Sequence, residues 1–78
     1  MALVAEFTVE PFVEGEPGPH VLAALAAAES SGLVVEFGPF GTSVRGDDPE
    51  VLAAAHQIVV LALAAGASRV SLQIQVVG

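Results

Sequence analysis

The sequence contains no cysteine among its 78 residues. A disulfide, a thiolate metal site and a thiol nucleophile are therefore excluded, and with them the crosslinks that commonly stabilise small domains. A chain of this length hides only about 60% of its extended surface on folding, so its own core is small. We expect a single domain over residues 1–78 that gains stability from a further source.

Basic residues are almost as scarce as cysteine. Two Lys and Arg side chains accompany nine Asp and Glu side chains, which gives a formal net charge of −7. Nucleic-acid binding depends on clustered basic side chains that displace counterions, so this balance argues against a nucleic-acid partner. An anionic membrane surface would repel the chain as well.

Apolar runs long enough to cross a membrane are also lacking. The longest candidate, residues 51–65, would form about 22 Å of helix against a hydrocarbon core of about 30 Å, and it contains His56 and Gln57. Near the amino terminus, Glu6 and Glu10 interrupt the apolar block that a signal peptide requires. We therefore expect a cytoplasmic protein that does not insert into membranes.

The chain is, by contrast, rich in apolar residues. Hydrophobic residues make up 54% of the sequence and charged residues 14%. This composition is too apolar for disorder and high for a free-standing monomer of this size. It predicts that the protein associates with copies of itself.

Four segments alternate between apolar and polar side chains, the pattern of strands with one buried face. They are residues 3–10, 33–37, 42–46 and 69–77. The short connection from Gly38 to Gly41 predicts that the second and third strands form a hairpin.

Two further segments carry alanine and leucine at helical spacing. The first begins near Pro19 and ends at Gly32, a glycine suited to the left-handed conformation that follows many helices. The second begins where Asp47 and Asp48, which offer a capping carboxylate, precede Pro49 at the first helical position, and it ends at Gly66.

The resulting order is strand, helix, strand, strand, helix, strand. With right-handed crossovers, this order predicts an α+β fold of the ferredoxin-like βαββαβ type. The four strands would form one antiparallel sheet with the first and third strands in the centre, and both helices would cover the same face.

The opposite face of this sheet would be open and polar. Its side chains are Val4, Glu6, Thr8, Glu10, Val34, Glu36, Ser43, Arg45, Arg69, Ser71, Gln73 and Gln75. Two interpretations remain: an ordinary solvated face, or a face covered by a ligand or another subunit. The second helix is apolar over more of its surface than one sheet contact needs, which favours subunit packing through the helix layer, a sheet edge or the open face.

Catalytic and metal-binding patterns are not evident. His20 lies at a helix start and His56 in mid-helix, so a site that uses both is not indicated. Ser43, Ser68 and Ser71 have no adjacent histidine to activate them as nucleophiles. We expect no catalytic residue and no bound metal.

Three segments, in this order and spacing, resemble the small thiamine-binding protein family of bacteria and archaea. They are Phe-Thr-Val-Glu-Pro at 7–11, Gly-Pro-Phe-Gly-Thr at 38–42, and Ala-His at 55–56 together with Ala-Ala-Gly-Ala-Ser-Arg-Val at 64–70. The resemblance extends over nearly the whole chain. It implies a ferredoxin-like dimer or tetramer that binds thiamine or its pyrimidine part near subunit contacts, without catalysis and without a further cofactor.

The same resemblance points to Thr42 and Ser43 as hydroxyl partners of the aminopyrimidine, and Thr8 matches the pattern of the first strand. Thiamine combines a cationic thiazolium ring with an aminopyrimidine that donates and accepts hydrogen bonds, so open-face glutamates and an aromatic ring suit it. Glu6, Glu10 and Glu36 are the acidic candidates, and Phe40 is the aromatic one. Arg45 stands where the family more often has an acidic residue.

Two other functions stay open at this stage. The chain could be a structural self-assembly module whose open face only contacts another copy. It could also be a small dimeric ferredoxin-like enzyme that acts on a substrate in the sheet cleft, although a proton-transferring group is not evident there.

Overall fold

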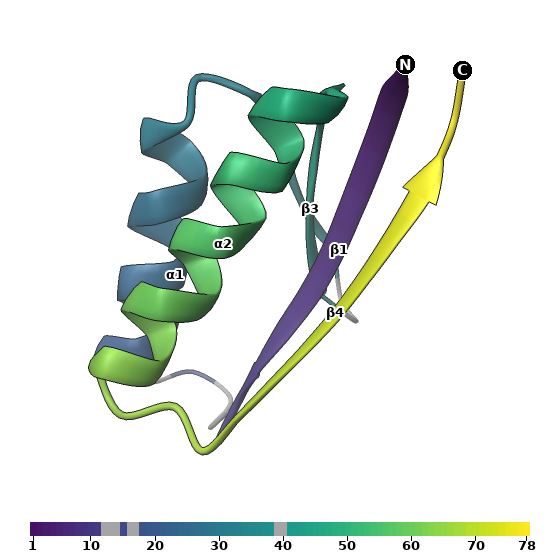
Figure 1. The fold of residues 1–78 in the computed structure, drawn as a ribbon. Helices are drawn as coiled ribbons and strands as arrows, with labels where there is room; N and C mark the ends of the chain where they lie inside the picture. Colours follow the sequence, from purple (N-terminus) through teal and green to yellow (C-terminus); the bar gives the residue numbers. More distant parts are fainter. Residues whose placement is uncertain (12–14, 16–17, 39–40) are drawn as a thin grey trace.

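The computed structural model describes residues 1–11, 15, 18–38 and 41–78. The elements follow the predicted order: β1 (Ala2–Glu10), α1 (Pro19–Ser30), β2 (Val34–Gly38), β3 (Gly41–Asp47), α2 (Asp48–Ala64) and β4 (Arg69–Val76). Within this described part, the strands form one antiparallel sheet in the order β2-β3-β1-β4, with β1 and β3 in the centre. Both helices cover one face of the sheet (Figure 1), which confirms the predicted ferredoxin-like α+β fold.

The core lies between β1 and the helices. Alternation along β1 places Leu3, Ala5, Phe7 and Val9 on the helix-facing side, and all four are buried. Ala5 lies opposite the fully buried Val44 of β3. The helix-facing side of β1 is therefore apolar throughout, which suits the central position of this strand in the sheet.

The two helices pack against each other mainly through alanine. The buried alanines are Ala24, Ala27 and Ala28 in α1 and Ala54, Ala55 and Ala62 in α2. Short side chains at a helix contact let the two backbones approach closely. Val51 and Ile58 of α2, both 0% exposed, fill the space between this helix and the sheet.

The start of α2 differs from the prediction in one respect. Asp47 holds the N-cap position, but its side chain makes no capping hydrogen bond, because Asp47 is also the last residue of β3 and is paired with Ala2. The Asp48 carboxylate instead lies 3.8 Å from the Met1 ammonium group, and the Asp48 N–H donates to the Met1 carbonyl at 2.9 Å. The capping hydrogen bond expected from the Asp47 and Asp48 pair is therefore not made by the N-cap residue, although acidic charge lies at the positive end of the helix dipole, as predicted.

His20, at the start of α1, connects this helix to the end of β1. Its side chain is buried, and its Nε2–H donates a hydrogen bond to the Pro11 carbonyl, which follows the end of β1. This contact ties the first turn of α1 to the end of the central strand. Across the part of the chain that the structure describes, no group of three or more His, Asp or Glu side chains could hold a metal ion.

Large apolar side chains remain on the surface, as the composition suggested. On α2 they are Leu52, Val60, Leu61 and Leu63. On β4, Ile74 and Val76 alternate onto the helix-facing side but are 41% and 58% exposed, because β4 is an edge strand that the helices cover incompletely. None of the described helices is long and apolar enough to cross a membrane.

Candidate functional site

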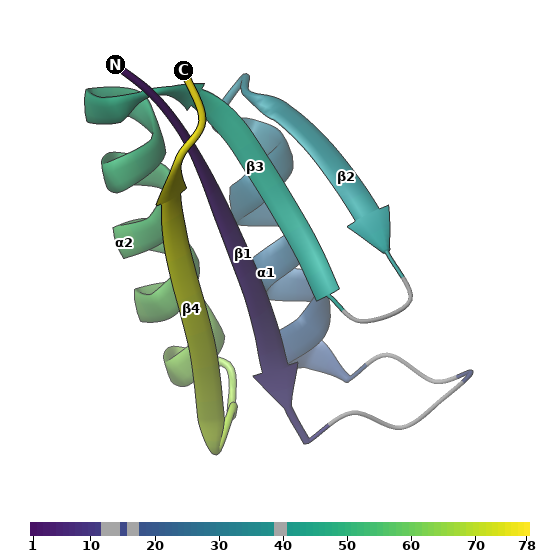
Figure 2. The ribbon, with the colours of Figure 1, turned by 90° about the vertical axis from the view of Figure 1, so that its right-hand side faces the viewer.

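Figure 2 looks onto the face of the sheet that carries no helix. The strand registers arrange its side chains in rows across the strands. One row is Val34, Arg45, Val4 and Gln75, the next is Glu36, Ser43, Glu6 and Gln73, and the third contains the pairs Gly38–Gly41 and Thr8–Ser71. The predicted membership of the open face agrees with this register.

A hollow of about 360 Å³ lies over the second and third rows, and we call it the open-face hollow. It is lined by Glu6, Phe7, Thr8, Glu36, Phe37, Gly41, Thr42, Ser43, Ser71 and Gln73. Pockets for small molecules typically enclose about 300–1,000 Å³, so this hollow has the size of a small-ligand site.

Glycines occupy the β2 and β3 positions of the third row, so these two strands add no side chain that could fill the hollow there. Gly41 has φ +155°, a backbone conformation that favours glycine, and Gly38 is its partner on β2. A Cβ atom at Gly41 would lie 2.9 Å from the Phe7 carbonyl oxygen and 3.1 Å from Thr8 Cγ2. The sheet is therefore bare beside Thr8, at a point where any side chain would collide with β1.

The chemistry of the hollow is acidic and rich in hydrogen-bonding groups. Glu36, Ser43 and Glu6 lie opposite one another on β2, β3 and β1, so the two glutamates are about 10 Å apart at their backbones with Ser43 between them. Gln73 of β4 follows Glu6 in the same row. Such a surface can accept hydrogen bonds from an amine and can attract a cation.

A second hollow lies between α1 and α2. It measures about 330 Å³ and is lined by Ala27, Ser30, Ser31, Glu50, Ala53, Ala54, Gln57 and Leu61. Three of these eight residues are alanines without polar side-chain groups, and one is a carboxylate. The second hollow offers one carboxylate, two hydroxyls and an amide, whereas the lining of the open-face hollow contains two carboxylates, four hydroxyls and an amide. The open-face hollow is therefore the better candidate for recognition of a polar ligand.

The structure brings together five residues that the sequence analysis singled out. The open-face hollow is lined by Glu6, Thr8, Glu36, Thr42 and Ser43. Ser43 lies in the row of the glutamates and presents its side chain on the open face. Thr42 lies in register with the buried Phe7, so alternation places its side chain toward the helices. Phe40 lies outside the described residues.

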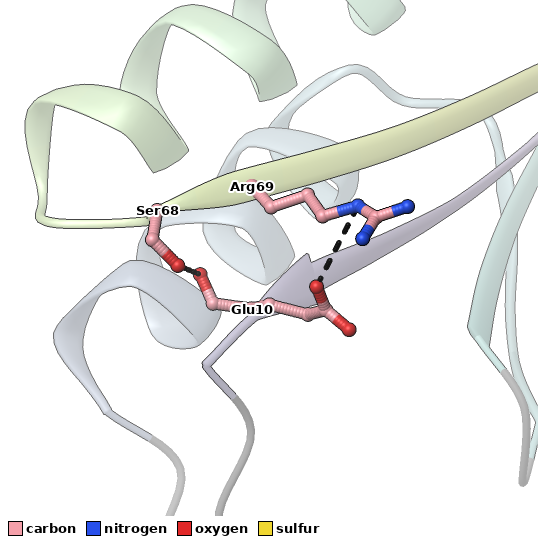
Figure 3. A network of polar contacts seen from close by, with 3 residues as sticks. All are labelled: Glu10, Ser68 and Arg69. Atoms are coloured by element: carbon pink, nitrogen blue, oxygen red, sulfur yellow. Dashed lines mark hydrogen bonds and ion pairs between the residues drawn. The ribbon is translucent and has the colours of Figure 1, made fainter.

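Glu10 lies at the end of β1 (Figure 3) and is not among the described residues that line the hollow. Arg69 Nε is 3.7 Å from Glu10 Oε2. The carbonyl of Glu10 accepts hydrogen bonds from the backbone N–H of Ser68 at 2.8 Å and from its hydroxyl at 3.3 Å. An exposed ion pair of this kind contributes at most about 1 kcal/mol to stability. A role of Glu10 in ligand binding stays a prediction.

Ser71 and Gln73 line the hollow but were not among the predicted site residues. Alternation alone had placed both on the open face. The additional signal was the ferredoxin-like strand order, which makes β4 a neighbour of β1. These two patterns place both residues beside β1 on the open face, but the register that sets Gln73 opposite Glu6 and Ser71 opposite Thr8 comes from the structure.

Solved structures of other proteins share this fold. A domain of unknown function from Bacillus cereus has a TM-score of 0.71 at 23% identity, with 95% of this chain and 72% of that chain covered. A hypothetical protein from Methanocaldococcus jannaschii has a TM-score of 0.69 at 27% identity, with 95% and 76% covered. A candidate thiamine biosynthesis or salvage protein from Thermotoga maritima has a TM-score of 0.59 at 22% identity, with 96% and 81% covered.

No curated protein gives a significant match to the chain. The family model of the thiamine-binding proteins, however, matches residues 5–77, which is nearly the whole sequence. This match confirms the resemblance found in the sequence and supports a thiamine-related role. The chain belongs to the thiamine-binding protein family.

Proposed function

We propose that this protein is a cytoplasmic, homo-oligomeric module that binds thiamine or a related aminopyrimidine and does not convert it chemically. The observation that carries the proposal is the open-face hollow, whose polar lining occurs in a chain of the thiamine-binding family. The name of that family describes binding and not catalysis.

The chemistry of thiamine fits the lining of the hollow. The thiazolium ring carries a positive charge, which Glu6 and Glu36 can attract. The aminopyrimidine donates hydrogen bonds through its amine and accepts them at its ring nitrogens. The Ser43 hydroxyl and the Gln73 amide can each donate and accept, so both rings have partners along one row of side chains.

Calorimetric titration with thiamine tests this proposal, and the wild-type protein is expected to give saturable heat. The Ser43→Ala variant is expected to bind about 2- to 10-fold more weakly, since a hydrogen bond contributes about 0.5–1.5 kcal/mol. Thr42→Val serves as the matched control, with a smaller effect because alternation directs that side chain toward the helices. Absence of saturable heat with folded wild-type protein would refute thiamine binding.

For self-association, we favour the edge of the sheet formed by β4. Proline and charged residues commonly protect an edge strand from pairing with another chain. The segment of β4 from Val70 to Val76 contains neither. Ile74 and Val76 are exposed on the same strand. Pairing of this edge with a second copy would bury apolar surface and satisfy the free backbone groups of β4.

Charged residues on this edge should prevent the association. The double variant Ile74→Lys, Val76→Lys is expected to sediment as a monomer of about 7.8 kDa, whereas the wild type sediments at a multiple of this mass. Leu22→Lys, which replaces an exposed apolar residue of α1, is the control and should leave the mass unchanged. A wild-type protein that is monomeric at micromolar concentration would contradict the proposed oligomer.

The alternative of a structural module without a ligand rests on the same exposed apolar side chains. The two functions separate when both measurements are made on one preparation. Oligomerisation without any thiamine heat would support the structural module, whereas saturable thiamine binding would exclude it.

A further inference from the structure

We propose that the open-face hollow selects unphosphorylated thiamine and discriminates against its phosphate esters. This inference rests on the proposed function, since it concerns which form of the ligand the same hollow accepts. It follows from the charges that line the hollow and from their positions in the sheet.

Two carboxylates flank the centre of the hollow. Glu6 of β1 and Glu36 of β2 lie on either side of Ser43, one strand away in each direction. A phosphate monoester adds about 1.5 to 2 negative charges at neutral pH, which removes the net positive charge of thiamine. A ligand seated over Ser43 would then bring its phosphate close to at least one carboxylate.

The groups that normally bind phosphate are missing from the lining. Proteins hold phosphate with Arg and Lys side chains, with helix N-termini or with concave arrangements of backbone N–H groups. All described residues that line the hollow belong to the four strands, and none of them is Lys, Arg or His. The backbone N–H groups of paired strands are directed toward the neighbouring strands and not toward the face of the sheet.

The two arginines of the open face do not reverse this balance. Arg69 is paired with Glu10, at the end of β1. Arg45 lies two residues from Ser43, in the adjacent row, with Glu6 and Glu36 as its diagonal neighbours on β1 and β2. One guanidinium beside two carboxylates leaves a net charge of −1 around the hollow, in a chain whose formal charge is −7.

The experiment compares thiamine, thiamine monophosphate and thiamine diphosphate by calorimetric titration at low salt. One unit-charge repulsion across about 4 Å of water changes an equilibrium constant about fivefold. We therefore expect the monophosphate to bind at least about fivefold more weakly than thiamine and the diphosphate more weakly still, with differences that shrink as salt screens the charges.

The double variant Glu6→Gln, Glu36→Gln is expected to weaken thiamine binding about fivefold or more and to reduce the preference over the esters. The double variant Glu29→Gln, Glu50→Gln changes the net charge equally but lies on the helices, so it should keep the wild-type preference. Retained far-ultraviolet circular dichroism would show that both variants are folded.

Equal or tighter binding of the phosphate esters by the wild type would overturn this inference while leaving thiamine binding intact. If Arg45→Gln then abolished that ester binding, Arg45 would be identified as the phosphate partner. Flat titrations with all three ligands would overturn both the inference and the proposed function.

Discussion

Replacement of Gly41 by valine is expected to lower the free energy of unfolding by about 1–3 kcal/mol or more and to abolish thiamine binding. Gly41 has φ +155°, a backbone conformation that residues with a Cβ atom rarely adopt. The added Cβ would also lie 2.9 Å from the Phe7 carbonyl oxygen, so β1 and β3 would have to separate. Urea denaturation measures the first effect and calorimetry the second.

Gly66→Val provides the matched control for this variant. Gly66 also has positive φ, at +110°, but no atom lies within 4 Å of the position its Cβ would take. The control should therefore show the backbone cost without the collision and, because Gly66 follows α2, should bind thiamine like the wild type. Equal stability loss in the two variants, together with intact binding in Gly41→Val, would show that the glycine pair does not create the hollow.

Truncation of Ile58 to alanine is expected to cost about 2–5 kcal/mol, the range for a large buried aliphatic side chain. Ile58 is fully buried between α2 and the sheet, and five of the other ten buried core residues are alanines, whose side chains cannot rearrange to fill the space. Domains of this size are stabilised by about 0.05–0.15 kcal/mol per residue, so the loss is a large share of the total. Thermal unfolding should show a decrease in Tm of more than about 8 °C.

Val60→Ala is the control for this truncation. Val60 lies on the same helix, half a turn away, and is 44% exposed. Its replacement should change stability by about 0.5 kcal/mol or less, as expected for a surface position. Similar losses in Ile58→Ala and Val60→Ala would mean that α2 is not anchored to the sheet through Ile58.

The strands and helices could be predicted because their signals are local. Alternation along residues 3–10 and 69–77 depends only on neighbouring side chains, and β1 and β4 begin and end within one residue of those limits. Gly32 and Gly66 both have the positive φ that follows a helix, as expected from their positions after α1 and α2. The capping hydrogen bond expected from Asp47 and Asp48 is not made by the N-cap Asp47, because this residue is also paired with Ala2 in the sheet, a competition that no local pattern contains.

The candidate site was predicted in part, and its limits are also physical. Alternation placed Glu36, Ser43 and Thr8 on the open face, where the structure brings them around one hollow. Thr42, which the resemblance put first among the hydroxyl partners, also lines the hollow but is in register with the buried Phe7, so its role in ligand binding stays a prediction. Gln73 was not singled out, because its proximity to Glu6 depends on two strands more than sixty residues apart.

The sequence by itself determined the element types, the polarity of the two sheet faces and the acidic charge, because each depends on residue type and short-range spacing. Only the tertiary structure decided that Glu6 and Glu36 flank Ser43 and that Gly38 and Gly41 leave a hollow beside Thr8. It also decided that Ile74 and Val76 stay exposed on the edge strand β4. These features arise from the register between distant strands and from how far two helices can cover four strands. Both are properties of packing, which the order of residues along one segment does not contain.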